Sequence, residues 1–261
     1  MIKKEYQEII RAAVAGGDVA AKYFGKSLKI EGKSMPADFR TKADLLAEKT
    51  VLKILTKKFP KYNIISEESS EKQNGSEYTF VIDPIDGTYN FVLGIPYFSC
   101  GIALFKDNNL VFGVVYEPML KNIFWAEKGK GAYHNGKRLC VNKETDLKNC
   151  SVCYARNYHT PISHEHNLLV KLENKHIKRF LRNWSILLDL CRIAAGKMEA
   201  IIIYGDLPVW DVAPARLIAK EAGALFTDYN GKPDSDKNTF FLATNGTKIH
   251  KEILEILKEK S

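Results

Sequence analysis

The sequence lacks the features that mark membrane-spanning and secreted proteins. No apolar run approaches the roughly 20 residues of a transmembrane helix. Residues 1–6 are charged and carry no apolar core of a secretory signal. The 5 cysteines are odd in number and scattered, which argues against a disulfide framework. We therefore expect a cytoplasmic protein without structural disulfides.

The sequence also contains no complete zinc-binding cysteine motif, no zinc-protease motif and no P-loop. Cys150 and Cys153 form one C-x-x-C without a second pair, so a structural role is favoured over a redox pair or half a zinc site. The His-Glu-His at 164–166 lacks the spacing of H-E-x-x-H. The glycine-rich stretch 129–136 contains no Gly-Lys-Ser/Thr, which excludes a nucleotide-binding P-loop.

The charge is positive but dispersed. The 39 Lys and Arg exceed the 31 Asp and Glu, giving a formal charge of +8, and 45% of the residues are hydrophobic. No block of like charge and no basic motif interleaved with aromatic residues is present. A solvated surface that helps to collect anionic ligands is favoured over a nucleic-acid surface, which remains the alternative.

Hydrophobic periodicity divides the chain into two halves. Residues 1–142 contain helical patterns at 2–24 and from 41 onward, then a short strand and an antiparallel meander. Gly16 and Gly17 are expected to loosen the middle of the first helix. Residues 143–261 alternate strands with helices, which predicts an α/β half packed rigidly on an α+β half. The expected elements of the second half are strands at 151–155, 177–181, 200–204, 224–227 and 240–243, and helices at 163–174, 186–196, 211–222 and 247–258.

The most informative stretch is Phe-Val-Ile-Asp-Pro-Ile-Asp-Gly-Thr-Tyr-Asn-Phe at 80–91. Its β-branched run predicts a buried strand that ends at Asp83, because Pro84 lacks a backbone donor and should prevent continuation. Asp83 and Asp86 stand three residues apart, so both carboxylates can face one space. The carbonyl of Ile85 lies between them as a third oxygen.

The next two residues suit an anion. Gly87 allows close backbone approach, and Thr88 offers a hydroxyl at the start of a short helix with free amides. Carboxylates, a carbonyl and amides in one short stretch suit Mg²⁺ holding a phosphate. Asp-Gly is also a common turn dipeptide, so a plain hairpin turn is the alternative.

The whole stretch resembles the metal-binding signature of the inositol monophosphatase family. That family includes bisphosphate nucleotidases, histidinol-phosphate phosphatases and, more distantly, fructose-1,6-bisphosphatases. Only Tyr89 is unusual, since the family usually has Thr there. A second signature, Trp-Asp-x-Ala, matches 210–213. The resemblance covers nearly the whole chain and implies a layered αβαβα sandwich, a homodimer, and hydrolysis of a phosphomonoester with two or three Mg²⁺.

The resemblance also implies roles for individual residues. Glu67, Asp83 and the Ile85 carbonyl hold the first metal, while Asp83, Asp86 and Asp211 hold the second. Water is activated by Glu67 together with an Asp44–Thr88 pair, and attacks phosphorus directly. The implied phosphate and substrate contacts are Asp86, Gly87, Thr88, Trp184, Tyr204 and Asp211.

Several of these residues have a simpler structural explanation. Asp44 can complete a capping box with Thr41, and Asp211 can be the N-cap of a helix that tolerates Pro214 in its first turn. Glu67 and Glu68 can be a polar loop after a strand. Of the two, the resemblance favours Glu67 as the ligand.

The substrate is less defined than the metal site. Inositol-specific family members carry a Glu shortly before Trp-Asp, where this chain has Ile203 or Tyr204, and Asp206 is shifted. Trp184 and the bulky residues after it replace Gly and small residues. Inositol 1-phosphate is therefore the default, with adenosine 3′,5′-bisphosphate and histidinol phosphate as alternatives. A different class of function is a basic protein that binds RNA or the transcription machinery and whose catalytic site is vestigial.

Overall fold

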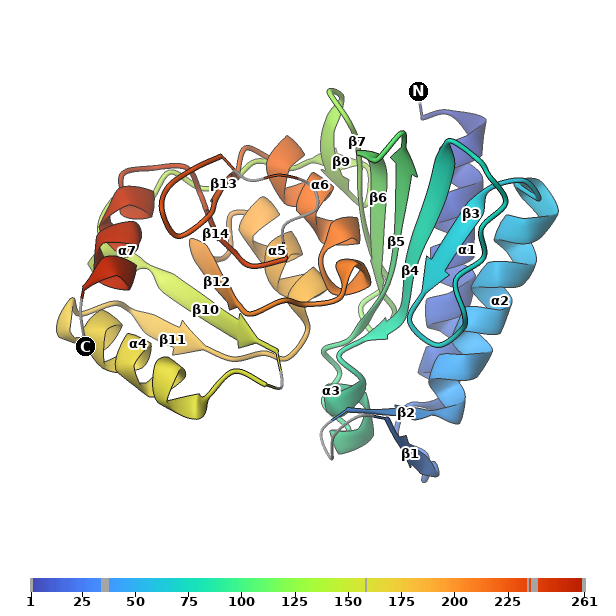
Figure 1. Cartoon of the computed structure of the whole chain (residues 1–261), viewed down its shortest axis with the longest axis horizontal. Helices are drawn as coiled ribbons and strands as arrows, with labels where there is room; N and C mark the ends of the chain where they lie inside the picture. Colours follow the sequence, from blue (N-terminus) through green and yellow to red (C-terminus); the bar gives the residue numbers. More distant parts are fainter. Residues whose placement is uncertain (1, 34–37, 158, 234, 236–238, 260–261) are drawn as a thin grey trace.

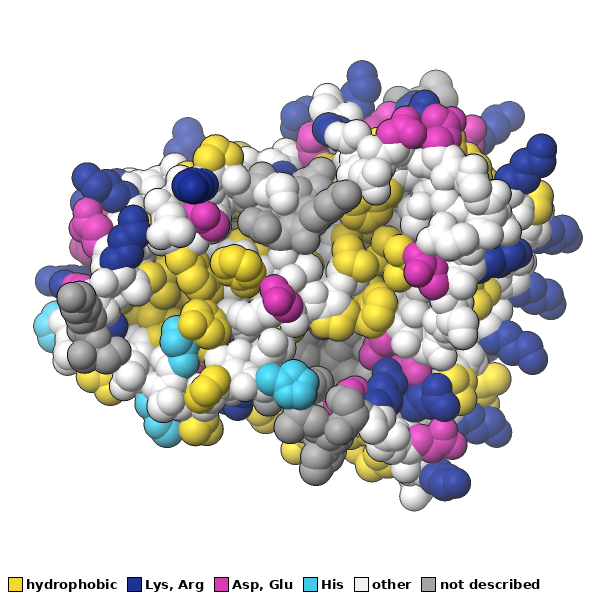
Figure 2. Space-filling model, in the orientation of Figure 1, with side chains coloured by type: hydrophobic (Ala, Val, Ile, Leu, Met, Phe, Trp, Pro, Cys, Tyr) yellow, Lys and Arg dark blue, Asp and Glu magenta, His cyan; other side chains and the backbone are white. Residues whose placement is uncertain are grey.

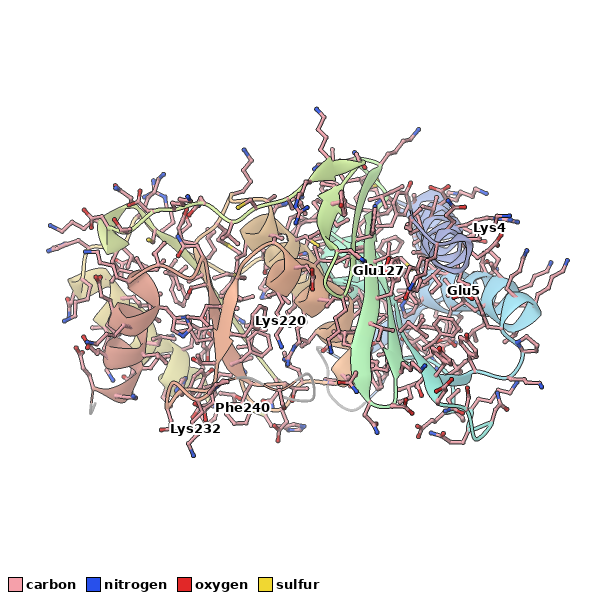
Figure 3. All side chains as sticks on the ribbon, turned by 90° about the horizontal axis from the view of Figure 1, so that it is seen from above. Lys4, Glu5, Glu127, Lys220, Lys232 and Phe240 are labelled. Carbon is pink, nitrogen blue, oxygen red and sulfur yellow. The ribbon has the colours of Figure 1, made fainter. Side chains whose placement is uncertain are left out.

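The computed structural model describes residues 2–33, 38–157, 159–233, 235 and 239–259 of the 261-residue chain. Over these residues the chain forms five layers, in the order helices, sheet, helices, sheet, helices (Figure 1). The same order is visible from above in Figure 3. The predicted layered α/β sandwich is therefore confirmed.

The first layer is a pair of helices, α1 (Lys4–Tyr23) and α2 (Lys42–Lys58), packed on one face of the first sheet. The expectation that Gly16 and Gly17 loosen α1 is wrong, because the helix is continuous through both. A Cβ at Gly16 would lie 2.5 Å from Val51 Cγ2, and one at Gly17 2.5 Å from Tyr116 Cδ1. The glycines let α1 approach α2 and the sheet closely.

The first sheet has seven strands in the order β3-β4-β5-β6-β7-β8-β9. β3 and β4 are parallel, and every later pair is antiparallel, as the predicted meander requires. Asp107 and Asn108 form the two-residue turn between β5 and β6. Both have positive φ, as a type I′ hairpin turn requires. The strands are β3 (Asn63–Ser66), β4 (Tyr78–Asp86), β5 (Ser99–Lys106), β6 (Asn109–Glu117), β7 (Asn122–Glu127), β8 (Gly131–His134) and β9 (Lys137–Arg138).

The expectation that Pro84 ends the strand is wrong. β4 runs through Pro84 to Asp86, and its register against β5 shifts between Asp83 and Asp86. A proline is tolerated at such a bulge because the ladder there needs no N–H from it. The bulge allows this one strand to present two carboxylates, those of Asp83 and Asp86.

The second sheet is mixed and has the order β11-β10-β12-β14-β13. β10 pairs in parallel with β11 and β12, while β14 is antiparallel to β12 and β13. Its strands are β10 (Ser151–Arg156), β11 (Arg179–Leu181), β12 (Ala200–Tyr204), β13 (Leu225–Thr227) and β14 (Phe241–Thr244). α5 (Ile186–Ala194) and α6 (Ala213–Glu221) lie between the sheets, and α4 (Ile162–Asn174) and α7 (Ile249–Lys258) cover the outer face (Figure 1).

Three large apolar clusters fill the spaces between the layers. One lies under α1 and α2, one surrounds α5 and α6 between the sheets, and one lies under α4 and α7. Cys150 belongs to the outer cluster and Cys153 to the central one, so they occupy opposite faces of the second sheet. Both thiols are buried and free, in agreement with a structural role.

All seven strands of the first sheet precede residue 142, and all strands of the second follow it. That residues 1–142 and 143–261 form two halves packed as one rigid body stays a prediction. Two short segments outside the layers are the antiparallel pair β1 (Ile30–Gly32) and β2 (Phe39–Thr41). They flank residues 33–38, of which 34–37 lie outside the described residues.

Candidate functional site

An acidic cavity of about 650 Å³ lies where the first sheet, α5 and the segment before α6 meet. Six carboxylates line it, and four of these, from distant parts of the sequence, are the predicted metal ligands. Glu67 follows β3, Asp83 and Asp86 belong to β4, and Asp211 precedes α6. Ile85, Gly87, Thr88 and Trp184, also predicted from the sequence, line the same cavity.

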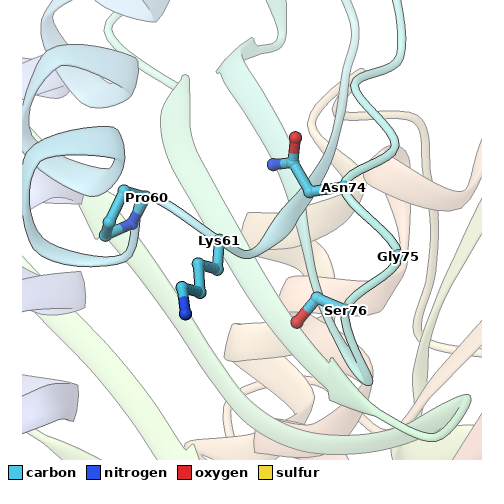
Figure 4. A pocket seen from close by; sticks show the side chains of 5 residues that line it. All are labelled: Pro60, Lys61, Asn74, Gly75 and Ser76. Carbon is cyan, nitrogen blue, oxygen red and sulfur yellow. The ribbon is translucent and has the colours of Figure 1, made fainter.

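A second hollow, of about 310 Å³, lies at the corner between α2 and β3 (Figure 4). It is lined by Pro60, Lys61, Asn74, Gly75 and Ser76. These residues supply one charge and no acidic or nucleophilic group beyond a serine hydroxyl. The larger cavity, in which charged groups converge, is therefore the candidate active site.

Asp83 carries a buried carboxylate oxygen without a hydrogen-bond donor in the part of the chain that the structure describes. Its side chain is buried, and its Oδ1 accepts no hydrogen bond from the described residues. Burial, followed by the negative charges of Glu67, Asp86 and Asp211, raises the pKa of Asp83 well above its ordinary value. A buried oxygen without a donor among like charges is a position that favours a cation.

Asp86 is held by the start of a helix in another part of the chain. Its oxygens accept hydrogen bonds from the hydroxyl of Ser185 and from the amides of Ile186 and Leu187, each at 3.1 Å. Burial raises the pKa of Asp86 to about 7, and these hydrogen bonds oppose that rise. Asp86 thus caps α5 from a neighbouring strand and fixes the two elements to each other. Sequence reasoning missed Ser185, whose hydroxyl resembles that of an ordinary N-cap.

Asp44 performs both functions that the sequence left open. Its Oδ2 accepts from the Thr41 amide and hydroxyl, each at 2.7 Å, which completes the capping box of α2. Its Oδ1 lies 3.1 Å from the hydroxyl of Thr88, which is also 2.9 Å from the Ile85 carbonyl. Asp44 itself is fully buried and is not among the residues that line the cavity. It reaches the site through Thr88, the first residue of α3 (Thr88–Leu93).

Gly87 occupies a position that other residues would strain. Its φ is +91°, and a Cβ there would lie 3.1 Å from the Tyr97 carbonyl oxygen and 3.2 Å from that of Trp184. Both the backbone conformation and the close approach of two carbonyls require glycine. The turn from β4 into α3 depends on this residue.

Glu67, and not Glu68, lines the cavity. Lys33 Nζ lies 2.8 Å from Glu67 Oε1 and 2.6 Å from Glu68 Oε1, while Arg40 also pairs with Glu68. Burial raises the pKa of Glu67 to about 7, against the opposing charge of Lys33. Sequence reasoning did not single out Lys33, because one lysine in a polar segment carries no distinguishing signal.

Asp211 is not the N-cap that a simple structural explanation requires. It closes a 3₁₀ turn, η2 (Val209–Asp211), and α6 begins at Ala213 with Pro214 in its first turn. Its carboxylate therefore does not cap the helix. Burial, then Glu67 and Asp86, raise the pKa of Asp211 well above its ordinary value. The side chain lines the cavity.

Two of the residues expected to contact substrate, Trp184 and Tyr204, differ in their position relative to the cavity. Trp184 lines the cavity. Tyr204 is absent from the lining and stacks between His164 and Tyr229, at ring-centroid distances of 3.5 and 5.8 Å. Its alternation in β12 turns it toward the outer helices, away from the carboxylates. Residues of the cavity wall that sequence reasoning did not select include Arg156, Asn157, His159, Arg182 and Trp210.

The donor set fits divalent cations. Among the described residues, no three His, Cys, Asp or Glu side chains are already drawn together around one point. The carboxylates nevertheless repel one another, and the orphaned Asp83 Oδ1 faces no hydrogen-bond donor. Hard carboxylate and carbonyl oxygens suit Mg²⁺, which would remove this repulsion.

Comparisons with known proteins agree with the fold. The profile of the inositol monophosphatase family matches residues 2–261. A fructose-1,6-bisphosphatase/inositol-1-monophosphatase of Aquifex aeolicus is 32% identical, covering 98% of this chain and 96% of that protein. The Nus factor SuhB of Pasteurella multocida is 35% identical, covering 94% and 92%.

Solved structures show the same similarity. The extragenic suppressor protein SuhB of Bartonella henselae superposes with a TM-score of 0.92 at 30% identity, covering 98% of this chain and 99% of that one. The IMPase of Thermotoga maritima superposes with a TM-score of 0.89 at 28% identity, covering 98% and 97%.

The layered sandwich and the carboxylates at its centre thus define the class of protein, that of the inositol monophosphatase and fructose-1,6-bisphosphatase fold. Within this class, the chain belongs to the inositol monophosphatase family. None of the helices among the described residues has the length and apolar character needed to cross a membrane.

Proposed function

We propose that this protein is a Mg²⁺-dependent phosphomonoesterase. The observation that carries the proposal is the meeting of Glu67, Asp83, Asp86 and Asp211 in one cavity, with a buried Asp83 oxygen that lacks a donor. Membership of a family of phosphatases supports it. Bound Mg²⁺ would neutralise the phosphate and acidify a water molecule.

The residues of the chain then have distinct roles. Glu67, Asp83, Asp86, Asp211 and the Ile85 carbonyl would hold two or three ions. The amides at the start of α3, after Gly87, bind phosphate oxygens. Thr88, whose hydroxyl donates to Asp44, accepts a hydrogen bond from the attacking water and orients that water toward phosphorus. Glu67 receives a proton from that water as the water oxygen bonds to phosphorus. The ester P–O bond breaks in the same displacement, and the departing alkoxide takes a proton from solvent water to leave as the alcohol, without a covalent phospho-enzyme.

The default substrate is inositol 1-phosphate. Relatives named as both fructose-1,6-bisphosphatase and inositol-1-monophosphatase, from Aquifex aeolicus and Thermotoga maritima, add fructose 1,6-bisphosphate to the candidates. Adenosine 3′,5′-bisphosphate and histidinol phosphate are further alternatives. All four are phosphomonoesters small enough for a cavity of about 650 Å³.

Phosphate release from these four compounds, with Mg²⁺ and with a chelator, tests the proposal. We expect turnover that requires Mg²⁺ and is abolished in Asp83→Asn. In H₂¹⁸O the label should enter the released phosphate. Label in the alcohol product would exclude direct water attack, and absence of turnover by folded protein on all four would contradict the proposed activity.

A second candidate is binding to RNA or to the transcription machinery, which the relatives named Nus factor SuhB suggest. On the face shown in Figure 2, Lys and Arg side chains are dispersed and form no single patch. A gel-shift assay with structured RNA, repeated with the double variant Asp83→Asn, Asp86→Asn, separates the two functions. RNA binding retained by the inactive variant would support this candidate.

The homodimer implied by the family resemblance is also a proposal. Light scattering coupled to size-exclusion chromatography should give about twice the chain mass of 29.5 kDa. A monomer mass at micromolar concentration would contradict it.

A further inference from the structure

Helix α2 carries two buried carboxylates, Asp44 and Glu48, one helical turn apart. Because they stand four residues apart, both side chains lie on the same face of the helix. Neither is among the residues that line the cavity. Asp44 reaches the site through Thr88, as described above. Glu48 reaches a different part of the cavity wall, the segment that follows β3 and carries Glu67.

One oxygen of Glu48 holds the residues on both sides of Glu67. Glu48 Oε2 accepts a hydrogen bond from the hydroxyl of Ser66, the last residue of β3, and another from the amide of Glu68 at 3.0 Å. The amide of Glu67 donates to the Ile82 carbonyl at 3.2 Å. Three consecutive residues are therefore fixed to neighbouring elements, the outer two to α2 and the central one to β4.

This arrangement places Glu67 next to Asp83. Ser66 pairs with Ile82 in the parallel register of β3 and β4, so the residues that follow them, Glu67 and Asp83, are neighbours at the end of the ladder. Both line the cavity. The Glu67 carboxylate itself lies 2.8 Å from Nζ of Lys33, whose long side chain is flexible and restrains it weakly. The backbone at Glu67 thus determines where this carboxylate enters the cavity.

The two donors need an acceptor oxygen at this place. Ser66 is buried and the Glu68 side chain is 1% exposed, so water would not readily replace the carboxylate of Glu48. A buried donor that loses its acceptor drives the surrounding backbone to rearrange until the donor finds another partner. Loss of the Glu48 oxygen should therefore displace the segment that carries Glu67.

We propose that Glu48 is a positioning residue, which sets the place of Glu67 in the cavity through Ser66 and Glu68. This inference rests on the proposed function, because it assigns Glu48 to the support of a carboxylate that would hold Mg²⁺. α2 would then support both groups proposed to contact the attacking water, Thr88 through Asp44 and Glu67 through Glu48. Residues behind a metal ligand commonly tune metal affinity in this way.

Two substitutions of Glu48 separate the acceptor oxygen from the charge. Glu48→Met removes the oxygen and keeps an unbranched side chain, whereas Glu48→Gln removes the charge and keeps an oxygen that can accept both hydrogen bonds. Mn²⁺ suits the same oxygen ligands as Mg²⁺, and electron paramagnetic resonance measures its binding without any substrate. We expect the Kd for Mn²⁺ to rise roughly 10-fold in Glu48→Met and to stay within about 2-fold in Glu48→Gln.

Val51→Ala is the matched control for a purely structural effect. Val51 is also buried on α2, but its side chain packs in the apolar cluster under α1 and α2. This variant should melt at a lower temperature than the wild type and bind Mn²⁺ with an unchanged Kd. If Glu48→Met does not fold, Ser66→Ala takes its place, because it removes one of the two donors and should raise the Kd by about 3-fold.

The binding measurement and turnover can fail independently. If no phosphomonoester is hydrolysed but the Kd for Mn²⁺ rises in Glu48→Met and not in Val51→Ala, the proposed function fails and the role of Glu48 stands. An unchanged Kd in Glu48→Met, an equal rise in Val51→Ala, an equal rise in Glu48→Gln, or no binding of Mn²⁺ by the wild-type protein would overturn the inference.

Discussion

The hydroxyl of Thr88 lies 3.1 Å from Asp44 Oδ1, and this contact joins two elements that are 44 residues apart in the sequence. It connects the turn after β4, which carries the metal-binding stretch, to the N-terminus of α2. Because Asp44 also completes the capping box, one carboxylate links the stability of a helix to the position of the hydroxyl that we propose orients water. The two roles can be separated experimentally.

Thr88→Val should lower kcat by roughly 100-fold, because it removes the hydroxyl that orients water while keeping the side-chain shape. Thr88→Ser should retain most of the activity. The matched control is Thr41→Val, which weakens the capping box and should lower the free energy of unfolding by about 1 kcal/mol. Chemical denaturation and steady-state kinetics measure the two effects. A large loss of kcat in the Thr41 variant would show that the roles are not separable.

Asp83→Asn should affect activity and stability in opposite directions. We expect kcat to fall by at least roughly 100-fold, because a carboxylate that would hold Mg²⁺ is lost. In metal-free buffer the free energy of unfolding should rise by about 1 kcal/mol, because the variant relieves the repulsion among buried carboxylates.

Mg²⁺ should raise the melting temperature of the wild-type protein more than that of Asp83→Asn. Asp107→Asn, which removes the same charge from the turn between β5 and β6, is the control. If Mg²⁺ raised the melting temperatures of the wild-type protein and of Asp83→Asn equally, this would contradict a metal site at Asp83.

Gly113→Ala should destabilise the protein by about 2 kcal/mol, since the added Cβ would lie 2.3 Å from the backbone carbonyl oxygen of Pro214 in α6. The displaced helix would carry Asp211 with it, so activity should also fall. Gly32→Ala is the matched control because a Cβ there meets no heavy atom within 4 Å. Thermal melting of both variants checks the expectation, and unchanged stability of Gly113→Ala would show that the sheet and α6 can move apart at little cost.

His250 should make a contribution to stability that is lost in mild acid, opposite in direction to that of the cavity carboxylates, whose pKa values are raised. This side chain is buried at the start of α7, 2.9 Å from the hydroxyls of Thr227 and Thr244. Burial lowers its pKa from 6.5 to about 4, so between these values the unfolded chain binds a proton that the folded protein does not. The contribution of neutral His250 to the free energy of unfolding is complete above pH 6.5 and is lost as the pH falls toward 4.

The loss attributable to His250 should amount to about 2 kcal/mol. Urea denaturation of the wild-type protein and His250→Gln at pH 7 and 4.5 measures it. The variant should be less stable than the wild type at pH 7 and should approach it at pH 4.5. A stability difference that does not change with pH would contradict the assignment.

The sequence by itself determined the family, the layered fold and the candidate metal-binding residues that line the cavity. Asp83, Asp86 and the turn that follows them lie within a few residues, and local spacing alone brings their groups together. The alternation of strands and helices is likewise a local pattern of side chains, which explains why the elements of the second half were predicted to within a few residues.

Contacts between distant segments were decided only by the tertiary structure. The bulge that carries β4 through Pro84, the capping of α5 by Asp86 and the turn that frees Asp211 from α6 each depend on a neighbouring element. The position of Tyr204 was also decided by the tertiary structure, because the packing of the two sheets sets which face of β12 is turned toward the cavity. Tyr89 and Trp184 are 95 positions apart, by subtraction of their residue numbers, and only the packing of α3 against the loop before α5 brings their rings into contact.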